Sequence, residues 1–213
     1  MEILKIKLCT LNIKEMKAFY TEVLEMELIE VSEKHFTVRA GNSKIEFHLS
    51  ETLPSYHFAV RTNIAYLTYI FNKVSKTHKD KVLCDIQGFE SGYWKGKQVY
   101  FHDPDGNIVE IIEQQVRCDE WYDVCEIGMP AGDVEQLAME LKELPNKNKP
   151  ESESFQFFGD ETGNFVLVKE SRGWFPTKQP STIHPIDIEI RAERVKNTTI
   201  TSRNLPYTIN VLK

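Results

Sequence analysis

Apolar and polar residues alternate over the first ten positions of the chain. Ile6 and Leu8 fall on one face of a strand predicted at 3–10, and Lys5 and Lys7 fall on the other. The spacing then becomes helical, because apolar residues recur along 13–23 after a capping residue at Asn12. Short strands are predicted at 27–31, 35–40 and 44–49. The first fifty residues therefore predict a strand, a helix and further strands.

The same succession begins again near residue 57. Segment 56–61 (YHFAVR) is strand-like, and apolar residues at helical spacing follow from Ile64 to Val74. A strand is predicted at 82–87. The turn at 103–107 (DPDGN) lies between strands predicted at 99–102 and 108–113. Pro early in a turn and Gly-Asn near its end suit a tight reversal, so this segment is predicted to be a hairpin.

A third, degraded round starts near Glu126. Segment 124–129 (VCEIGM) has the pattern of YHFAVR, 130–133 predicts a turn and cap, and apolar spacing predicts a helix from Val134 to Leu141. The polar stretch 145–154 is predicted to be a mobile surface loop. GDETGNFVL (159–167) repeats HDPDGNIVE (102–110) and aligns Leu167 with Glu110. Strands at 186–190 and 207–211 are predicted to close this third unit.

The internal period predicts an α+β fold of repeated βαβββ units. The four strands of one unit form a curved sheet with the helix on its convex face, and two such sheets must pair to bury enough apolar surface. Their concave faces then enclose a pocket. We predict a paired domain at 1–116, with units about 1–53 and 54–116, and a degenerate third unit with a β-rich tail at 117–213. Whether the units pair within one chain or across a dimer is open.

Composition narrows the possible partners. The net charge of -6, without a basic stripe, argues against a nucleic-acid partner. No run of about 18 apolar residues and no signal-peptide pattern occurs, so no membrane segment is expected and the cytoplasm is the expected location. The four scattered cysteines are expected to be small buried residues rather than a disulfide framework.

The segment 98–114 (QVYFHDPDGNIVEIIEQ) is similar to the closing strand pair of the vicinal oxygen chelate superfamily, which includes glyoxalase I, extradiol dioxygenases and bleomycin-resistance proteins. The pattern F-x-D-P-D-G-N-x-x-E is met from Phe101 to Glu110. YHFAV at 56–60 and NIKEMKAFYTEVLEM at 12–26 extend the resemblance over 4–113. It implies the glyoxalase/dioxygenase fold of paired βαβββ units.

In that superfamily the metal ligands lie on the first and last strands of each unit. Carried over position by position, this implies Lys5 and His57 on first strands and Glu46 and Glu110 on last strands. His57, Glu110 and Glu46 are the predicted ligands of a divalent metal (Fe, Zn, Ni or Mn), and Glu110 is the predicted catalytic residue. The third unit offers Glu126, so it is interpreted as a non-metal half that serves architecture or dimer contacts.

Lys5 departs from the family pattern, because an ammonium has no lone pair to donate to a metal. Either a three-ligand site survives, or Lys5 forms an ion pair with Glu46 or Glu110 where the cation would sit, and no metal is bound. Lys5, His48 and Trp94 are the predicted substrate-binding residues; His48 shares a face with Glu46, and Trp94 lies with Tyr93 in a loop that could cover the cavity. The aromatic–proline segment 174–177 is predicted to be a packed corner.

Two functions are consistent with these residues. One is a metal-dependent lyase of glyoxalase type or a ring-cleaving dioxygenase, which acts on a small molecule in the cavity. Ring cleavage at a site of two histidines and one carboxylate would need a second histidine, which the predicted strand does not supply. The other is a metal-free protein that binds or sequesters a small molecule, as in bleomycin resistance. A homodimer is expected in both cases, and a purely structural dimer is a third reading.

Overall fold

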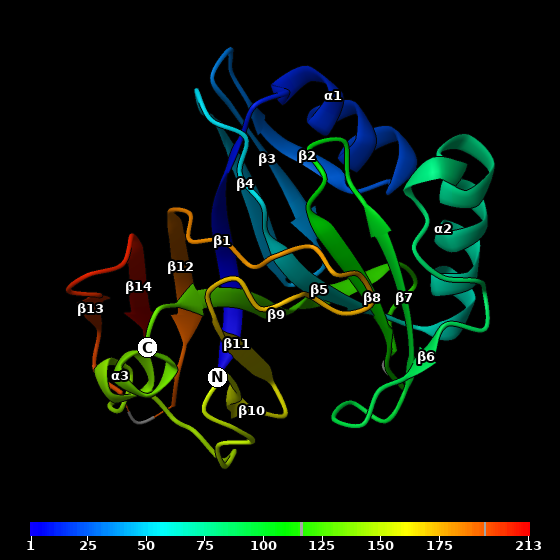
Figure 1. Cartoon of the computed structure of the whole chain (residues 1–213). Helices are drawn as coiled ribbons and strands as arrows, with labels where there is room; N and C mark the ends of the chain where they lie inside the picture. The colour runs from blue at the N-terminus through cyan, green and yellow to red at the C-terminus, as the bar shows by residue number, and fades with distance from the viewer. Residues whose placement is uncertain (116, 194) are drawn as a thin grey trace.

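The computed structural model describes residues 1–115, 117–193 and 195–213, and its strands form one 14-stranded sheet (Figure 1). Four parallel strand pairs organise this sheet. They are β1 with β4, β5 with β8, β9 with β11 and β12 with β14. Each pair holds the first and last strand of one repeat unit, so the chain contains four units rather than the three that the sequence indicates.

The first unit follows the predicted order. It comprises β1 (Glu2–Thr10), α1 (Ile13–Ala18), a π-helical turn (Phe19–Val23), β2 (Glu27–Val31), β3 (His35–Ala40) and β4 (Ser43–Leu49). Ile6 and Leu8 of β1 are fully buried against the helix, as the alternation predicts. Asn12 precedes α1, but its side chain forms no cap; its amide donates to Asp105 of the second unit over 2.8 Å.

The second unit comprises β5 (His57–Thr62), α2 (Ile64–Thr77), a 3₁₀ turn (Lys79–Lys81), β6 (Phe89–Glu90), β7 (Lys97–His102) and β8 (Ile108–Glu113). Asn63 caps α2 by accepting the amide N–H of Tyr66. The predicted hairpin of β7 and β8 is confirmed. The strand predicted at 82–87 is wrong, because this segment makes only an isolated bridge between Val82 and Phe101.

The third unit comprises β9 (Trp121–Ala131), α3 (Val134–Glu140), β10 (Phe155–Asp160) and β11 (Gly163–Lys169). Asp133 caps α3 as predicted, accepting from the amide of Gln136. The polar stretch 145–154 packs more than its composition indicates. Asn148 bonds to the carbonyl of Gly159 and to Asn164, and the Tyr93 hydroxyl reaches Asn148.

The last strands form a fourth unit and do not close the third. They are β12 (Ile186–Arg191), β13 (Thr198–Thr201) and β14 (Tyr207–Leu212), and this unit contains no helix among its described residues. The third unit is already closed by β11, which pairs with β9. The strands themselves were predicted correctly, but their pairing was not, because alternation does not specify a partner.

The units pair in a nested order. β5 runs antiparallel to β9, which joins the second unit to the third, and β1 runs antiparallel to β12, which joins the first unit to the fourth. β1 and β9 meet only at the bridge between Ile3 and Val124. The strand pairing therefore does not join the first two units directly, as the predicted domain 1–116 supposed; its end, residue 116, lies outside the described residues.

The DPDGN turn holds the first two units together. Asp105 accepts from the Thr10 hydroxyl over 2.5 Å, and Asp103 accepts from the Tyr20 hydroxyl over 3.0 Å. Asn107 fixes the start of β5 by accepting the amide of Tyr56. Complete burial raises the pKa of Asp103 to about 7, against the lowering effect of its bonds from Asn107 and Tyr20. The most recognisable motif of the sequence thus has a structural role.

Helices cover the outer face of the sheet, and the candidate site lies on the opposite, concave face. Figure 1 shows α1 beside the strands of the first unit and α2 beside β7 and β8. The main apolar core lies between these helices and the sheet, with Phe47, Phe58 and Phe101 fully buried in it. In the part of the chain that the structure describes, no helix is long and apolar enough to cross a membrane.

Candidate functional site

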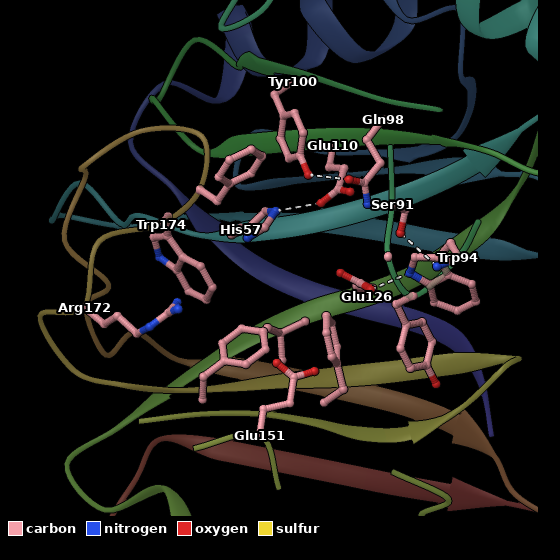
Figure 2. A pocket seen from close by; sticks show the side chains of 16 residues that line it. His57, Ser91, Trp94, Gln98, Tyr100, Glu110, Glu126, Glu151, Arg172 and Trp174 are labelled. Atoms are coloured by element: carbon pink, nitrogen blue, oxygen red, sulfur yellow. Dashed lines mark hydrogen bonds and ion pairs between the residues drawn. The ribbon is translucent and has the colours of Figure 1, made fainter. Parts of the chain in front are cut away.

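A cavity of about 410 Å³ lies against the paired second and third units. Strands β5, β8 and β9 form its base, the loop 91–94 and β10 flank it, and the segment 172–175 closes one end (Figure 2). Its walls are mainly aromatic. The residues that the following paragraphs use are His57, Trp94, Tyr100, Glu110, Glu126, Glu151, Phe155, Val166, Arg172 and Trp174.

His57 and Glu110 meet at the base of this cavity. The Nε2 atom of His57 lies 3.1 Å from Oε2 of Glu110, and their side chains are 10% and 3% exposed. The geometry follows from strand register, because Ala59, two residues after His57 and on the same face, is the partner of Glu110 in β8. The two residues that carry the predicted site therefore converge in a hollow, as predicted.

Glu126 on β9 is the third polar residue at the base. It is 5% exposed, and its Oε1 accepts the indole N–H of Trp94 over 2.5 Å. Burial, and secondly the charge of Glu110, raise the pKa of Glu126 well above its usual value, and the Trp94 bond opposes this only in part. Two carboxyl groups thus share one water-poor space, an arrangement that a cation would stabilise.

Several polar atoms around His57 have no protein partner. Among the described side chains, Nδ1 of His57, Oε1 of Glu110 and Nε1 of Trp174 are buried without a hydrogen bond. Buried polar groups are normally satisfied, so a cluster of unsatisfied groups in one cavity marks a place where another molecule or ion supplies the missing contacts. Burial and then the charge of Glu110 also raise the pKa of Tyr100, whose hydroxyl bonds to Gln98 over 3.2 Å.

Trp174 forms the wall beside His57. The two rings meet edge to face with centroids 4.8 Å apart, and Trp174 is 3% exposed. Gly128 on β9 permits this approach, because a Cβ atom there would lie 2.6 Å from Cη2 of Trp174. Trp174 is buried, as expected for a packed corner, but the space that it helps to enclose is the cavity.

The first and fourth units hold a different arrangement at the positions that correspond to His57 and Glu110. Lys7, two residues after Lys5, is the β4 partner of Glu46, which repeats the step from His57 to Glu110. Here Nζ of Lys5 lies 2.6 Å from Glu189 on β12 and 3.5 Å from Glu46. Glu46 also contacts His48, which lies on the same face as predicted. An ammonium therefore lies among the carboxylates of this face.

The structure thus divides the predicted ligand set. His57 and Glu110 line the cavity, whereas Glu46, Lys5 and His48 form a separate ion-pair cluster on the first and fourth units. The prediction placed all four positions in one site because it paired the first unit with the second. The sheet instead brings Glu126 to the cavity, a residue that the sequence reading assigned to a non-metal half.

The position on β11 that corresponds to Glu110 on β8 is Val166 and not Leu167. Val166 lies opposite Gly128, two residues after Glu126, and it lines the cavity; Leu167 faces the main core on the other side of the sheet. The alignment misplaced this residue because the β10–β11 turn needs only Glu161 and Thr162, which is shorter than DPDGN. Both Val166 and Leu167 are apolar, so this position of the third unit has no side chain that could bind a metal.

The predicted loop residues and two other polar side chains are placed as follows. Trp94 and Tyr93 line the cavity, whereas His102 does not and bonds instead to Gln179 over 3.1 Å. Arg39 is on the outside, paired with Glu27. All four cysteines are free, as predicted, but only Cys125 is buried; Cys9, Cys84 and Cys118 are half-buried.

Arg172 and Phe155 were missed by the sequence reading. Both are brought to the cavity by the third unit and the segment after it, whose position depends on pairing that one sequence does not reveal. The signal that could have pointed to Arg172 is its place two residues before Trp174, in a segment already noted for its aromatic residues.

Comparison with known proteins identifies the family. A model of the Glyoxalase/Bleomycin resistance protein/Dioxygenase superfamily matches residues 2–111, about half of the chain. None of the curated proteins compared matches this sequence. The chain belongs to this superfamily.

Solved structures show the same fold over the whole chain. One is a putative dioxygenase from Bacillus subtilis, with a TM-score of 0.66 and 15% identity, covering 99% of this chain and 85% of that one. Another is a V278E mutant of glyoxalase I from Zea mays, with a TM-score of 0.63 and 14% identity, covering 99% and 91%. Identities this low establish the fold and leave the reaction to the site itself.

Proposed function

We propose that this protein is a metal-dependent enzyme, a lyase or an oxidoreductase, that acts on a small organic molecule in the cavity of the second and third units. His57, Glu110 and Glu126 would hold the metal. The observation that carries the proposal is the gathering of one imidazole and two buried carboxyl groups on one concave face, at three of the four equivalent strand positions.

These residues fit a divalent transition metal in kind. Imidazole and carboxylate donors suit Zn, Fe, Ni or Mn. Oε1 of Glu110 is buried without a partner, and burial and the charge of Glu110 raise the pKa of Glu126, so a cation would stabilise the charged form of both groups. Among the described residues, no three such side chains already lie close enough to coordinate one ion, so the side chain of Glu126, which now bonds to Trp94, would have to turn toward the metal.

The residues of the chain would have distinct roles. The metal, when bound, supplies Lewis-acid chemistry. Trp174 and Tyr100 flank His57 and exclude water from it. Oε1 of Glu110 is buried without a partner at the base of the cavity, so Glu110 would be the acid–base residue that exchanges a proton with the substrate. Glu126 would release its proton when the ion binds.

Metal titration by calorimetry tests the proposal. Protein stripped with a chelator should bind one Zn²⁺ or Mn²⁺ per chain. Loss of a contact that supports a metal ligand typically costs about 10–100-fold in affinity, and loss of the ligand itself should cost more, so Glu110→Gln and Glu126→Gln should each weaken binding by about 100-fold or more. Glu46→Gln is the matched control and should leave the affinity unchanged.

Absence of binding, or a loss of binding with Glu46→Gln and not with Glu110→Gln, would contradict the proposal. Oxygen uptake with a catechol is measured on the Mn²⁺-loaded protein, because Zn²⁺ has no redox chemistry: uptake supports an oxidoreductase, and its absence counts against one.

A metal-free binding protein is the second candidate. It is favoured by the bonds that His57 and Glu126 already make inside the protein, to Glu110 and from Trp94, and by the apolar Val166 at the fourth position. On this alternative, the cavity keeps its affinity for organic ligands after complete removal of metal, and no ion binds in the titration.

The oligomeric state and cellular location remain predictions. Both sheet pairs are completed within one chain, so the cavity does not require a second copy for its closure. Sedimentation equilibrium would test the expected homodimer, and fluorescence imaging of a tagged chain would test the expected cytoplasmic location.

A further inference from the structure

We propose that Arg172 binds an acidic group of the substrate, so that the molecules this site accepts are small organic acids. The acidic end would lie at the Arg172 side of the cavity, and the reacting end at His57 and Glu110. This inference rests on the proposed function for the reacting end, and it adds the substrate class.

Arg172 is fixed at one end of the cavity by a bonded segment of backbone, residues 171–181, which we call the strap. The amide of Ser171 donates to Ser181 over 2.8 Å, and the amide of Trp174 donates to Gln179 over 2.9 Å. The Gln179 side chain donates in turn to the hydroxyl of Ser55 and the carbonyl of Gly106, which anchors the strap to the second unit. The main chain that carries Arg172 is therefore held in place.

The guanidinium of Arg172 is available to a ligand. Its Cζ atom lies 4.7 Å from the centre of the Phe155 ring, which orients the group without using its N–H donors. Within the described part of the chain, the Arg172 side chain makes no hydrogen bond or ion pair. Figure 2 shows it beside Trp174, at one end of the cavity. The Trp174 ring adds an apolar wall at that end.

The chemistry of these groups selects an acid. A guanidinium presents its N–H groups as a planar fork that matches the two oxygens of a carboxylate. Phe155 and Trp174 supply flat apolar contacts for the body of the ligand. Carboxylates at the base do not oppose this, because the metal of the proposed function would neutralise Glu110 and Glu126.

Glu151 allows a test of the sign of the ligand's charge. It lines the same cavity and has no ion-pair partner among the described residues. Its charge should weaken the binding of an acid and strengthen the binding of an amine. Removing Arg172 and removing Glu151 must therefore shift affinity in opposite directions, and the two directions reverse if the natural ligand is a cation.

The experiment uses three probes that share a catechol head and differ at the opposite end: 3,4-dihydroxybenzoate, its neutral amide, and 3,4-dihydroxybenzylamine. Binding to the Zn²⁺-loaded full chain is followed by quenching of tryptophan fluorescence. The benzoate should bind about 10-fold or more tightly than the amide, as charge-assisted bonds require. Arg172→Gln should remove this preference, Arg172→Lys should keep part of it, and Glu151→Gln should tighten benzoate binding several-fold. Arg39→Gln, an exposed arginine outside the cavity, is the control and should change nothing.

Tighter binding of the amine than of the benzoate, or an unchanged benzoate preference in Arg172→Gln, would overturn the inference. Failure of the proposed function looks different. In that case, Zn²⁺ would not bind or would not change the affinity of any probe, while the ranking of the three probes would still report on Arg172.

Discussion

The two pairs of units in this molecule, the second with the third and the first with the fourth, have corresponding positions on their first and last strands and use them differently. In the second and third units these positions bring together His57, Glu110 and Glu126 in a cavity closed by the strap. In the first and fourth units they bring together Lys5, Glu46 and Asp187, and Glu189 joins Lys5 there. In the cavity, Glu126 has no ion-pair partner among the described residues, whereas Lys5 and Lys7 pair with the carboxylates of the other face.

The pKa directions record this difference. Burial tends to raise the pKa of Glu46, but its bond from His48 and the charge of Lys5 prevail, so the pKa is lowered. Burial also tends to lower the pKa of Lys5, and its partners Glu189 and Glu46 prevail by raising it. For Glu126, by contrast, burial and the charge of Glu110 prevail over the bond from Trp94 and the charge of Arg61, so its pKa is raised. Burial that the neighbouring groups offset only in part, rather than residue type, therefore distinguishes the candidate site.

The largest expected effect is on stability, and it compares a buried ion pair between the second and third units with a half-exposed one between the first and fourth units. Arg61 on β5 and Asp123 on β9 are 4% and 11% exposed and joined through Nε and Oδ1 over 2.7 Å. Removing one partner leaves the other charge buried, so Asp123→Ala should lower the free energy of unfolding by about 3–5 kcal/mol. Glu189→Ala, in the half-exposed pair with Lys5, should cost less than about 1 kcal/mol. Urea denaturation measures the free energy of unfolding of both variants. Equal losses would show that the two ion pairs do not differ in their contribution to stability.

A smaller effect is expected from the carboxyl group of Glu126, in protein freed of metal. In the unfolded state this carboxyl group loses its proton as the pH rises above the usual glutamate pKa near 4.5. In the folded state the raised pKa means that the proton is kept to a higher pH. The stability that this group contributes is therefore present below that pH and lost as the pH rises toward the folded pKa. Glu126→Gln should therefore stabilise the protein at pH 7 and have little effect at pH 4.

Denaturation of both proteins at the two pH values provides the measurement. Equal stability of wild type and variant at pH 7 would show that Glu126 is not penalised by burial. Glu46→Gln should show the opposite sign at pH 7, because its lowered pKa stabilises the folded state above the usual value.

The smallest effect is expected from the ammonium of the other face. Lys5→Gln should change the free energy of unfolding by less than about 1 kcal/mol, since the side chain is 25% exposed. It should also free Glu46, His48 and Glu189 for a cation, so that a second and weaker Zn²⁺ site appears in calorimetric titration. A stoichiometry that stays at one would show that Lys5 does not take the place of an ion.

Local patterns predicted much of the fold. The alternation that marks Lys5 and Ile6, the helical stripe ending at Val74 and the hairpin around Gly106 all depend on neighbouring residues, and the structure confirms each. The family motif also identified His57 and Glu110 correctly as residues that converge, because one parallel strand pair within a single unit brings them together.

Pairing between units could not be predicted in the same way. Glu46 was placed in the site and Glu126 outside it because alternation specifies which face a side chain occupies and not which strand lies alongside. Leu167 was taken as the counterpart of Glu110 because a shorter turn shifts the register by one residue. Arg172 lies in a segment without periodicity, whose position depends on contacts with Gly106 and Ser55 far away in the sequence.

The nested pairing of the units has a consequence for how the chain folds. The second and third units are adjacent in sequence, so β5 and β9 can associate after closing a loop of moderate length. β1 must instead wait for β12, near the other end of the chain, and contacts so distant in sequence form slowly. During synthesis the inner pair can assemble first, while the exposed edge of β1 stays unprotected until the last strands emerge.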